Sequence, residues 1–317
     1  MASKEASPVF SKIDQNVSFA DLAELLGLSV EKLIQQMRKA GLESPSRSWV
    51  PPEMARRVLE QKGLRFAKQT VSFQMLKGGV AKTTSALNFG WRAAMYGARV
   101  LMVDLDQQAN LTFALGVDAE NLPVWVDIVE KKVTAREARV RIAPGLDLIP
   151  SSLNNSVLDR VLLQSHRNWS TSVQAPLRDL QGEYDLIILD TAPSLSILNT
   201  AVTCASDVVV LPIAPDKFSL LGLQKHLGDL RELEKEFDLS IEKRVLFTRF
   251  DGRETASHEI LTKCTDLFED LLLKNYIRSS SELKNTLGTG RTIYSSKSPA
   301  KQDYDLVTRE LLGLPLE

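Results

Sequence analysis

The chain has 317 residues, a length that suits one large domain with a smaller one better than a single compact core. Hydrophobic residues make up 44% and charged residues 25%, and 39 Lys and Arg nearly balance 40 Asp and Glu. This ordinary globular composition excludes a disordered tail protein, a collagen-like fibre and a coiled-coil rod, and the net charge of −1 gives no general attraction to nucleic acid.

Residues 1–66 are predicted to form a small all-α domain. Short helices are expected at 18–29, 30–40 and 51–62, with Ser18 and Ser29 as N-caps and Gly27 ending the first helix. Prolines at 51 and 52 suit the first turn of the third helix. Two short helices joined by a glycine-containing turn are typical of a helix-turn-helix.

Residues 67–317 show the alternation of strands and helices that is typical of an α/β domain. Apolar strands are predicted at 71–76, 99–103, 146–150, 186–189, 208–213 and 245–248, with an amphipathic helix at 82–96. Near-continuous apolar strands separated by helices predict a mostly parallel twisted sheet flanked by helices on both faces.

A phosphate-binding loop is predicted at 77–84, between the first strand and the first helix of this domain. Small residues there let backbone N–H groups surround phosphates, while Lys82 can reach the β- and γ-phosphate oxygens and Thr83 can bind Mg²⁺. The strict P-loop pattern requires glycine at 76 and 81, where this chain has leucine and alanine. The predicted nucleotide-binding residues are Lys77, Gly78, Gly79, Val80, Ala81, Lys82, Thr83 and Thr84.

Three acidic residues stand at predicted strand ends. Asp104 and Asp106 occupy alternate positions after the second strand, so their side chains point to the same side. Asp190 ends the apolar strand 186–189. We expect Asp104 and Asp190 to support Mg²⁺ together with Thr83. The alternative for each acid is a structural role, as a cap of a strand end or of the following helix.

Together these segments resemble the ParA/MinD family of P-loop ATPases. The resemblance is carried by the deviant Walker A pattern K-G-G-x-x-K-T at 77–83 and by V-D-L-D-Q-Q-A-N at 103–110, where Gln107 replaces the usual proline. It is also carried by the Walker B-like Y-D-L-I-I-L-D-T-A-P-S at 184–194, and by matches at 209–212 and 218–223. The similarity extends over residues 68–317.

The resemblance implies a slow ATPase that forms ADP and phosphate, with ATP and Mg²⁺ bound in an ATP-sandwich homodimer. It implies that Asp106 orients the attacking water, that Lys82 bridges the β- and γ-phosphates, and that Lys77 reaches the nucleotide of the other subunit as an arginine finger does. Ala81 departs from the usual glycine, so a positive φ at this position would strain the loop and weaken turnover.

Basic residues concentrate in two parts of the nearly neutral chain. Residues 1–68 hold 11 Lys and Arg against 8 Asp and Glu, and residues 274–301 hold six against one. Relatives of the ParA type bind DNA nonspecifically through basic residues of the C-terminal part, and a solvated helix face is the alternative. The candidate DNA contacts there are Lys274, Arg278, Lys284, Arg291, Lys297 and Lys301.

The N-terminal segment resembles the helix-turn-helix modules of the longer plasmid partition ParA proteins. It is also similar to the small helical module of translation factors of the initiation-factor-two type. If it reads operator DNA, helix 30–40 would enter the major groove, although a docking helix has much the same composition. That helix would offer Lys32, Gln35, Gln36 and Arg38.

The function implied by this resemblance is partition of plasmid or chromosome DNA. The ATP-bound dimer would bind DNA, and a ParB-like adaptor would stimulate hydrolysis and release it, with autorepression through the N-terminal module. The alternatives are an ATPase that positions a protein cargo on the nucleoid and a nucleotide-switched repressor. No apolar run reaches the roughly 18 residues of a membrane span, so we expect a cytoplasmic, nucleoid-associated protein without a membrane partner.

Overall fold

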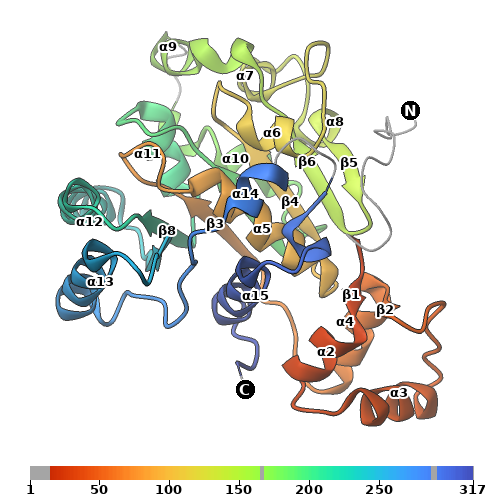
Figure 1. Ribbon diagram of the computed structural model, residues 1–317. Helices are drawn as coiled ribbons and strands as arrows, with labels where there is room; N and C mark the ends of the chain where they lie inside the picture. The colour runs from red at the N-terminus through yellow and green to blue at the C-terminus, as the bar shows by residue number, and fades with distance from the viewer. Residues whose placement is uncertain (1–14, 165–167, 287–290, 317) are drawn as a thin grey trace.

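The computed structural model describes residues 15–164, 168–286 and 291–316, except for the side chains at 284 and 285 (Figure 1). Its centre is a seven-stranded sheet in the order β5-β6-β4-β7-β3-β8-β9. The strands are β3 Gln69–Phe73, β4 Val100–Asp104, β5 Val140–Ala143, β6 Leu146–Ile149, β7 Leu186–Asp190, β8 Val208–Ile213 and β9 Glu242–Phe247. All neighbours pair in parallel except β5 with β6, an antiparallel hairpin whose first strand the sequence analysis missed. The predicted fold class is confirmed.

Helices cover both faces of this sheet. Along β4, Val100 and Met102 face one core, whereas Leu101 and Val103 face the other, because side chains alternate along a strand. The first face is covered by α5 Lys82–Met95 and α15 Pro299–Leu311. The second is covered by α7 Trp125–Val129, α9 Leu158–Gln164, α10 Gln174–Arg178, α11 Ile197–Cys204, α12 Lys217–Phe237 and α13 Thr255–Phe268. Shorter helices are α6 Asn110–Ala114, α8 Ala135–Ala138, α14 Ser281–Thr286, η1 Leu153–Val157, η2 Trp169–Thr171 and η3 Ile293–Ser295.

The N-terminal module contains the three predicted helices, now bounded as α2 Phe19–Leu25, α3 Val30–Lys39 and α4 Pro52–Gln61. Ser18 and Ser29 cap the first two, accepting hydrogen bonds from the backbone N–H groups three residues on. The module is not purely helical, because β1 Val17–Ser18 pairs antiparallel with β2 Trp49–Val50. This short strand pair ties the start of the module to the segment before α4.

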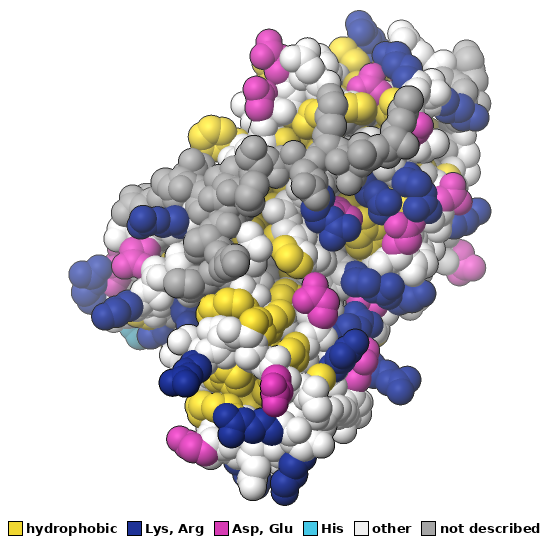
Figure 2. All heavy atoms as spheres, turned by 90° about the vertical axis from the view of Figure 1, so that its right-hand side faces the viewer, with side chains coloured by type: hydrophobic (Ala, Val, Ile, Leu, Met, Phe, Trp, Pro, Cys, Tyr) yellow, Lys and Arg dark blue, Asp and Glu magenta, His cyan; other side chains and the backbone are white. Residues whose placement is uncertain are grey.

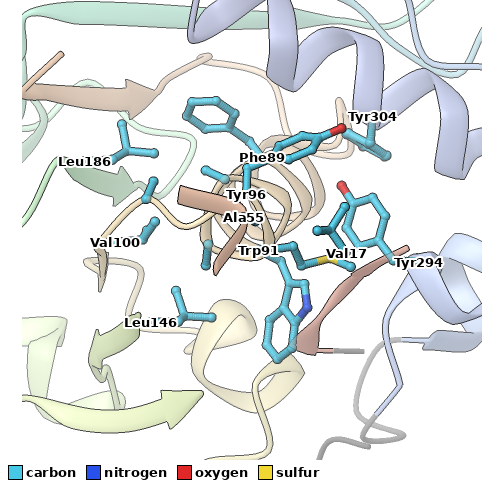
Figure 3. Packing of buried hydrophobic residues seen from close by; sticks show 14 of the residues in the cluster. Val17, Ala55, Phe89, Trp91, Tyr96, Val100, Leu146, Leu186, Tyr294 and Tyr304 are labelled. Carbon is cyan, nitrogen blue, oxygen red and sulfur yellow. The ribbon is translucent and has the colours of Figure 1, made fainter. Parts of the chain in front are cut away.

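The hydrophobic core does not divide at residue 66. Val17 and Ala55 of the N-terminal module belong to the same buried cluster as Trp91 of α5 and Tyr96, which directly follows that helix (Figure 3). Gly97, which follows α5, has φ +93 and leaves no room for a Cβ against the Pro52 carbonyl of α4. The module therefore packs directly on the helix that begins at the phosphate loop.

A buried network of charges crosses the same contact. Arg92 of α5 is fully buried and donates from Nε to Asp305 Oδ1 at 2.5 Å and from Nη2 to Asp21 Oδ2 at 2.8 Å. Tyr96 donates its hydroxyl to Asp305 at 2.6 Å, and the buried Arg309 reaches the second Asp305 oxygen at 2.6 Å. Because Asp21 lies on α2, the N-terminal module supplies part of the charge that balances Arg92.

Neither cysteine is activated: Cys264 is buried in the core, and Cys204 is partly buried. Burial raises the pKa of Cys264 to about 12 and that of Cys204 to about 11, so both thiols are protonated at neutral pH. Among the described residues, no helix is long and apolar enough to cross a membrane.

Candidate functional site

Several polar residues meet at the carboxyl edge of the parallel strands. The loop 77–81 follows β3, Asp104 and Asp190 are the last residues of β4 and β7, and Asp216 and Arg249 follow β8 and β9. Neighbouring parallel strands end at the same edge, so residues far apart in sequence come together there.

The loop 77–81 leads directly into α5, which begins at Lys82. Gly79 has φ +76, and Ala81 lies in the left-handed region with φ 67 and ψ 31. The positive φ considered for Ala81 is therefore present, and an alanine there costs about 1–2 kcal/mol relative to an unstrained backbone. The free N–H groups at the start of a 14-residue helix make this end attractive to an anion.

Lys82 is 7% exposed and folds back over the loop, where its Nζ donates to the Lys77 carbonyl at 3.3 Å. Burial lowers the pKa of Lys82, while the charges of Asp190 and Asp106 raise it. Among the described residues this ammonium makes only that long hydrogen bond, so it can still take up anionic oxygens.

Asp190 is fully buried, and neither of its carboxylate oxygens has a hydrogen-bond partner among the described residues. Burial and the charge of Asp104 hold the pKa of Asp190 well above its ordinary value, and the nearby Thr83 hydroxyl opposes them. Asp190 caps no helix, because α11 begins seven residues later with Ser196 as its N-cap. A buried carboxylate without a donor is costly and calls for a cation.

The pair Thr83 and Asp190 fits Mg²⁺, a hard cation that takes oxygen ligands and usually completes its shell with phosphate and water oxygens. In the described parts of the chain, no group of three or more His, Cys, Asp or Glu could hold a metal ion by itself. A Mg²⁺ at this edge would therefore depend on the oxygens of a bound nucleotide.

Asp104 holds the following loop in place. Its Oδ1 accepts from the Asp106 N–H at 3.1 Å, and its Oδ2 accepts from the Thr112 N–H at 2.9 Å and from the Thr112 hydroxyl at 2.7 Å. Burial raises the pKa of Asp104 to about 6. Because α6 starts after Ala109, which has no capping oxygen, Asp104 satisfies an N–H of its first turn. Asp104 therefore has the structural role considered as the alternative in the sequence analysis: it holds the loop at the end of its strand.

Asp106 lies two residues further along the same loop and is 6% exposed. Its Oδ1 accepts from the Gln108 N–H at 2.9 Å, and its backbone carbonyl accepts from the buried Ser151 hydroxyl at 2.7 Å. No donor from the described residues engages Oδ2 of Asp106, so this oxygen can accept from a water.

The structure adds Asp216, which the sequence analysis did not single out. Lys77 Nζ lies 2.5 Å from Asp216 Oδ1, and both side chains are about one-third exposed, at 36% and 37%. Asp216 also caps α12 by accepting from the Ser219 N–H at 2.9 Å. Asp216 could have been suggested by its position just after the predicted strand 208–213, because all the parallel strands end at this edge.

Thr248 and Arg249 were also missed, although Thr248 ends the predicted strand 245–248 and Arg249 follows it. The Thr248 hydroxyl donates to the Val80 carbonyl at 3.2 Å, and Arg249 Nη1 donates to the Gly79 carbonyl at 2.9 Å. Arg249 itself has φ 57. The end of β9 thus supports two consecutive carbonyls directly before the strained Ala81.

A pocket of about 240 Å³ opens beside this support. It connects the loop with the segment 277–280 and with the side chain of Tyr304 on α15. Its walls include Ala81, Thr84, Thr248, Arg249, Ile277 and Leu283. Mixed apolar and hydrogen-bonding walls next to a phosphate loop suit the base and sugar of a nucleotide.

The candidate DNA contacts lie in two separate places. Lys32, Gln35 and Arg38 are exposed on α3, while Gln36 is half-buried. Their exposure fits the predicted recognition face, which stays a prediction.

In the C-terminal part, Lys274, Arg291 and Lys297 are exposed. By contrast, Arg278 lies 2.6 Å from Asp303, and Lys301 lies 3.3 Å from Asp21. The side chain of Lys284 lies outside the described residues. Part of the basic surplus counted along the sequence is therefore used in ion pairs within the chain.

Comparison with known proteins places this site in context. A family model described as an AAA domain matches residues 68–243. The virulence plasmid ParA family protein pGP5-D of Chlamydia psittaci is 31% identical over 255 residues, which cover 77% of this chain and 94% of that protein. The cell division protein PomZ of Myxococcus xanthus is 25% identical over 293 residues, covering 91% of this chain and 90% of PomZ.

A solved structure with bound nucleotide is also similar to this chain. The cobyrinic acid a,c-diamide synthase of Mycobacterium smegmatis, with bound ATP analogue and magnesium, superposes with a TM-score of 0.69 at 28% identity. The match covers 78% of this chain and 98% of that one.

Proposed function

Because the chain belongs to the ParA family of P-loop ATPases, we propose that it hydrolyses ATP to ADP and phosphate and uses the ATP-bound state to hold DNA during partition. The observation that carries the proposal is the fully buried Asp190, whose carboxylate has no hydrogen-bond partner in the described parts of the chain and lies beside Thr83 and Lys82 at the start of α5. This arrangement suits a magnesium-bound nucleoside triphosphate.

Each part of the nucleotide has a matching group in the chain. The backbone of 78–83 would surround the phosphates, and Lys82 would bridge the β- and γ-phosphates. The pocket between Arg249 and Tyr304 would take the base and sugar. Lys82 would exchange its long contact with the Lys77 carbonyl for charge-assisted hydrogen bonds to the phosphates.

Hydrolysis needs charge neutralisation and an oriented water. When bound, Mg²⁺ would neutralise charge on the β- and γ-phosphate oxygens, held by the Thr83 hydroxyl and, through water, by Asp190. Asp106 would orient the attacking water through its free Oδ2, while Asp104 fixes the Asp106 N–H and the first turn of α6. Asp104 therefore supports the metal region indirectly.

The homodimer is supported by the surface around Lys77. Phe218 is 79% exposed and Leu221 61% exposed on the first turns of α12, directly after Asp216, and Leu195 is 66% exposed in the loop after Asp190. Large exposed apolar side chains beside a nucleotide site indicate a binding surface. A second copy covering them would bring its own Lys77 to this nucleotide.

A partition cycle requires DNA binding that depends on nucleotide. We expect the full chain to bind random duplex DNA with ATP and Mg²⁺ at least about tenfold more tightly than with ADP or without nucleotide, a differential of roughly 1.4 kcal/mol. Fluorescence anisotropy of a labelled duplex, at one fixed salt concentration, measures this difference. Equal affinity in all three states would contradict the proposed cycle, and stimulation of turnover by a ParB-like adaptor is its second requirement.

Because Ala81 is strained, we expect its replacement by glycine to improve ATP binding or turnover. In Ala81→Gly the backbone conformation is kept and the strain of about 1–2 kcal/mol is relieved, so we expect ATP affinity or turnover to rise by about tenfold. Phosphate release and nucleotide titration, compared with the wild type, measure both quantities. The control is Lys131→Gly, which relieves the same kind of strain at φ 62 in the turn after α7, outside the candidate site. An equal gain in that control would show that general relaxation, not the phosphate loop, is responsible.

A further inference from the structure

The backbone of the loop 77–81 has an inner side, which faces a bound anion, and an outer side. Gly79 and Ala81 have positive φ angles of 76 and 67, whereas Val80 between them does not. Such an alternation turns successive backbone N–H groups towards one concave side, which is how a backbone nest binds an anion. The carbonyl groups of these peptides lie on the outer side, because the C=O and N–H of a trans peptide bond point in opposite directions.

The outer side of the loop is hydrogen-bonded to the residues that follow β9. The Thr248 hydroxyl donates to the Val80 carbonyl at 3.2 Å. Arg249 donates from Nη1 to the preceding carbonyl, that of Gly79, at 2.9 Å. With these two carbonyls held outward, the N–H groups of Val80 and Ala81 are turned inward, towards the place of the phosphates.

The residues that hold the loop are themselves anchored. Thr248 is fully buried, and its N–H donates to the Ile213 carbonyl of β8 at 2.8 Å. The same carbonyl lies 3.1 Å from the Thr248 hydroxyl, so this hydroxyl is held between β8 and the loop. Phe250 is hydrogen-bonded through both its N–H and its carbonyl to the segment 277–279, at 2.9 and 2.8 Å. Arg249 therefore lies between two fixed residues, and such support keeps a binding group in one geometry.

Contacts at the loop matter because the chain offers an anion little long-range attraction. The net charge is −1, and on the face shown in Figure 2 Lys and Arg side chains are interspersed with Asp and Glu. A surface of mixed charge does not draw in an anion as a surface of one sign does. Binding of a triphosphate therefore depends on the groups that touch it, among them the inward N–H groups of the loop.

We propose that Thr248 and Arg249 are positioning residues for phosphate binding, which act through the N–H groups of Val80 and Ala81. Without them the two peptides are free to rotate, and Ala81 leaves the left-handed conformation that alanine does not favour. The apparent affinity for a ligand falls in proportion to the fraction of chains that hold the binding conformation. The inference rests on the proposed function, because it concerns how the triphosphate of that function is held.

The experiment replaces the buried hydroxyl and restores it. In Thr248→Val, which has nearly the same shape, we expect the affinity for ATP and Mg²⁺ to fall by about tenfold. In Thr248→Ser, which keeps the hydroxyl, we expect an affinity within about threefold of the wild type. The control is Thr308→Val, which removes another buried hydroxyl, one that donates to the Tyr304 carbonyl within α15 at 2.7 Å, and should leave the affinity unchanged. Titration with a fluorescent ATP analogue measures all four proteins.

Two further measurements separate positioning from other roles of Thr248. Steady-state phosphate release should show kcat changed by less than about threefold in Thr248→Val, because bound phosphates hold the N–H groups inward once ATP is saturating. Inorganic tripolyphosphate, which has no base or sugar, should compete with the ATP analogue and lose affinity by the same factor as ATP. Thr248 also lines the pocket beside the loop, so a loss confined to ATP would mean that it contacts the base or sugar and would overturn the positioning role.

Arg249→Met tests the second contact. We expect a smaller loss of ATP affinity, about threefold, because the Arg249 side chain is exposed and water can replace its bond to the Gly79 carbonyl. A loss of a hundredfold or more would mean that the guanidinium binds the phosphates directly, and would overturn positioning for this residue.

The outcomes also distinguish this inference from the proposed function. A wild-type chain that binds neither ATP nor tripolyphosphate would reject both. If the wild type binds ATP and hydrolyses it, but Thr248→Val binds it equally well, the proposed function is retained and the positioning role is overturned. Equal losses in Thr248→Val and Thr248→Ser would also overturn it, since the hydroxyl would not be the cause.

Discussion

Replacing Lys77 by alanine is expected to lower ATP turnover by about a thousandfold or more while nucleotide affinity changes by less than about tenfold. The reason is the position of its charge. Lys82 is buried over the loop, whereas Lys77 is turned outward to Asp216 at the exposed rim beside Phe218. A charge at that rim can reach the nucleotide of a second subunit and contributes little to binding in its own. Steady-state phosphate release and titration with a fluorescent ATP analogue measure the two effects.

Asp216→Asn is the matched variant for this prediction. Asparagine keeps the N-cap of α12 but removes the charge that now pairs with Lys77. Because Lys77 must leave Asp216 to act on a second subunit, we expect Asp216→Asn to keep turnover. Full turnover in Lys77→Ala, or an equal loss in Asp216→Asn, would contradict the role of Lys77.

Replacing Arg92 by methionine is expected to lower the free energy of unfolding by about 3–5 kcal/mol. Methionine fills much of the same volume, so the main effect is electrostatic. Asp305, whose side chain is 7% exposed, loses one of the two guanidinium groups that balance it, and Asp21 loses its closest partner. Urea denaturation, followed by far-ultraviolet circular dichroism, measures the loss.

Arg253→Met is the control for the arginine network. Arg253 pairs with Asp251 at 2.7 Å, but its side chain is 90% exposed, and solvent-exposed pairs contribute little to stability. We expect its denaturation curve to overlay that of the wild type. If Arg92→Met were equally harmless, the buried network would not be what joins the N-terminal module to α5.

The candidate nucleotide loop could be predicted from the sequence because its parts are consecutive. The predicted phosphate-binding loop consists of the backbone of eight successive residues and of two side chains within them, so the segment 77–84 contains all of it. The acids could be placed because strand patterning shows where strands end. Their individual roles could not, since Asp104 is tied to Thr112 and Asp190 is left without a donor only in the folded chain.

Counting charged residues along the sequence does not show which of them are paired in the folded chain. Counting by segment indicated the C-terminal stretch, where Arg278 and Lys301 prove to be paired with Asp303 and Asp21. Arg99, Arg139 and Arg141 are likewise paired, with Asp185, Glu183 and Asp147.

Sequence alone determined the fold class and the family and predicted the phosphate loop, because hydrophobic periodicity and a contiguous backbone motif are local properties of the chain. Tertiary structure decided which charges are free. Arg92 faces Asp21 and Asp305, Lys77 faces Asp216, and Arg99 shares Asp185 with Arg56 only after distant segments pack together. The strength of a charge depends on its burial and its neighbours, and both are set by the complete fold.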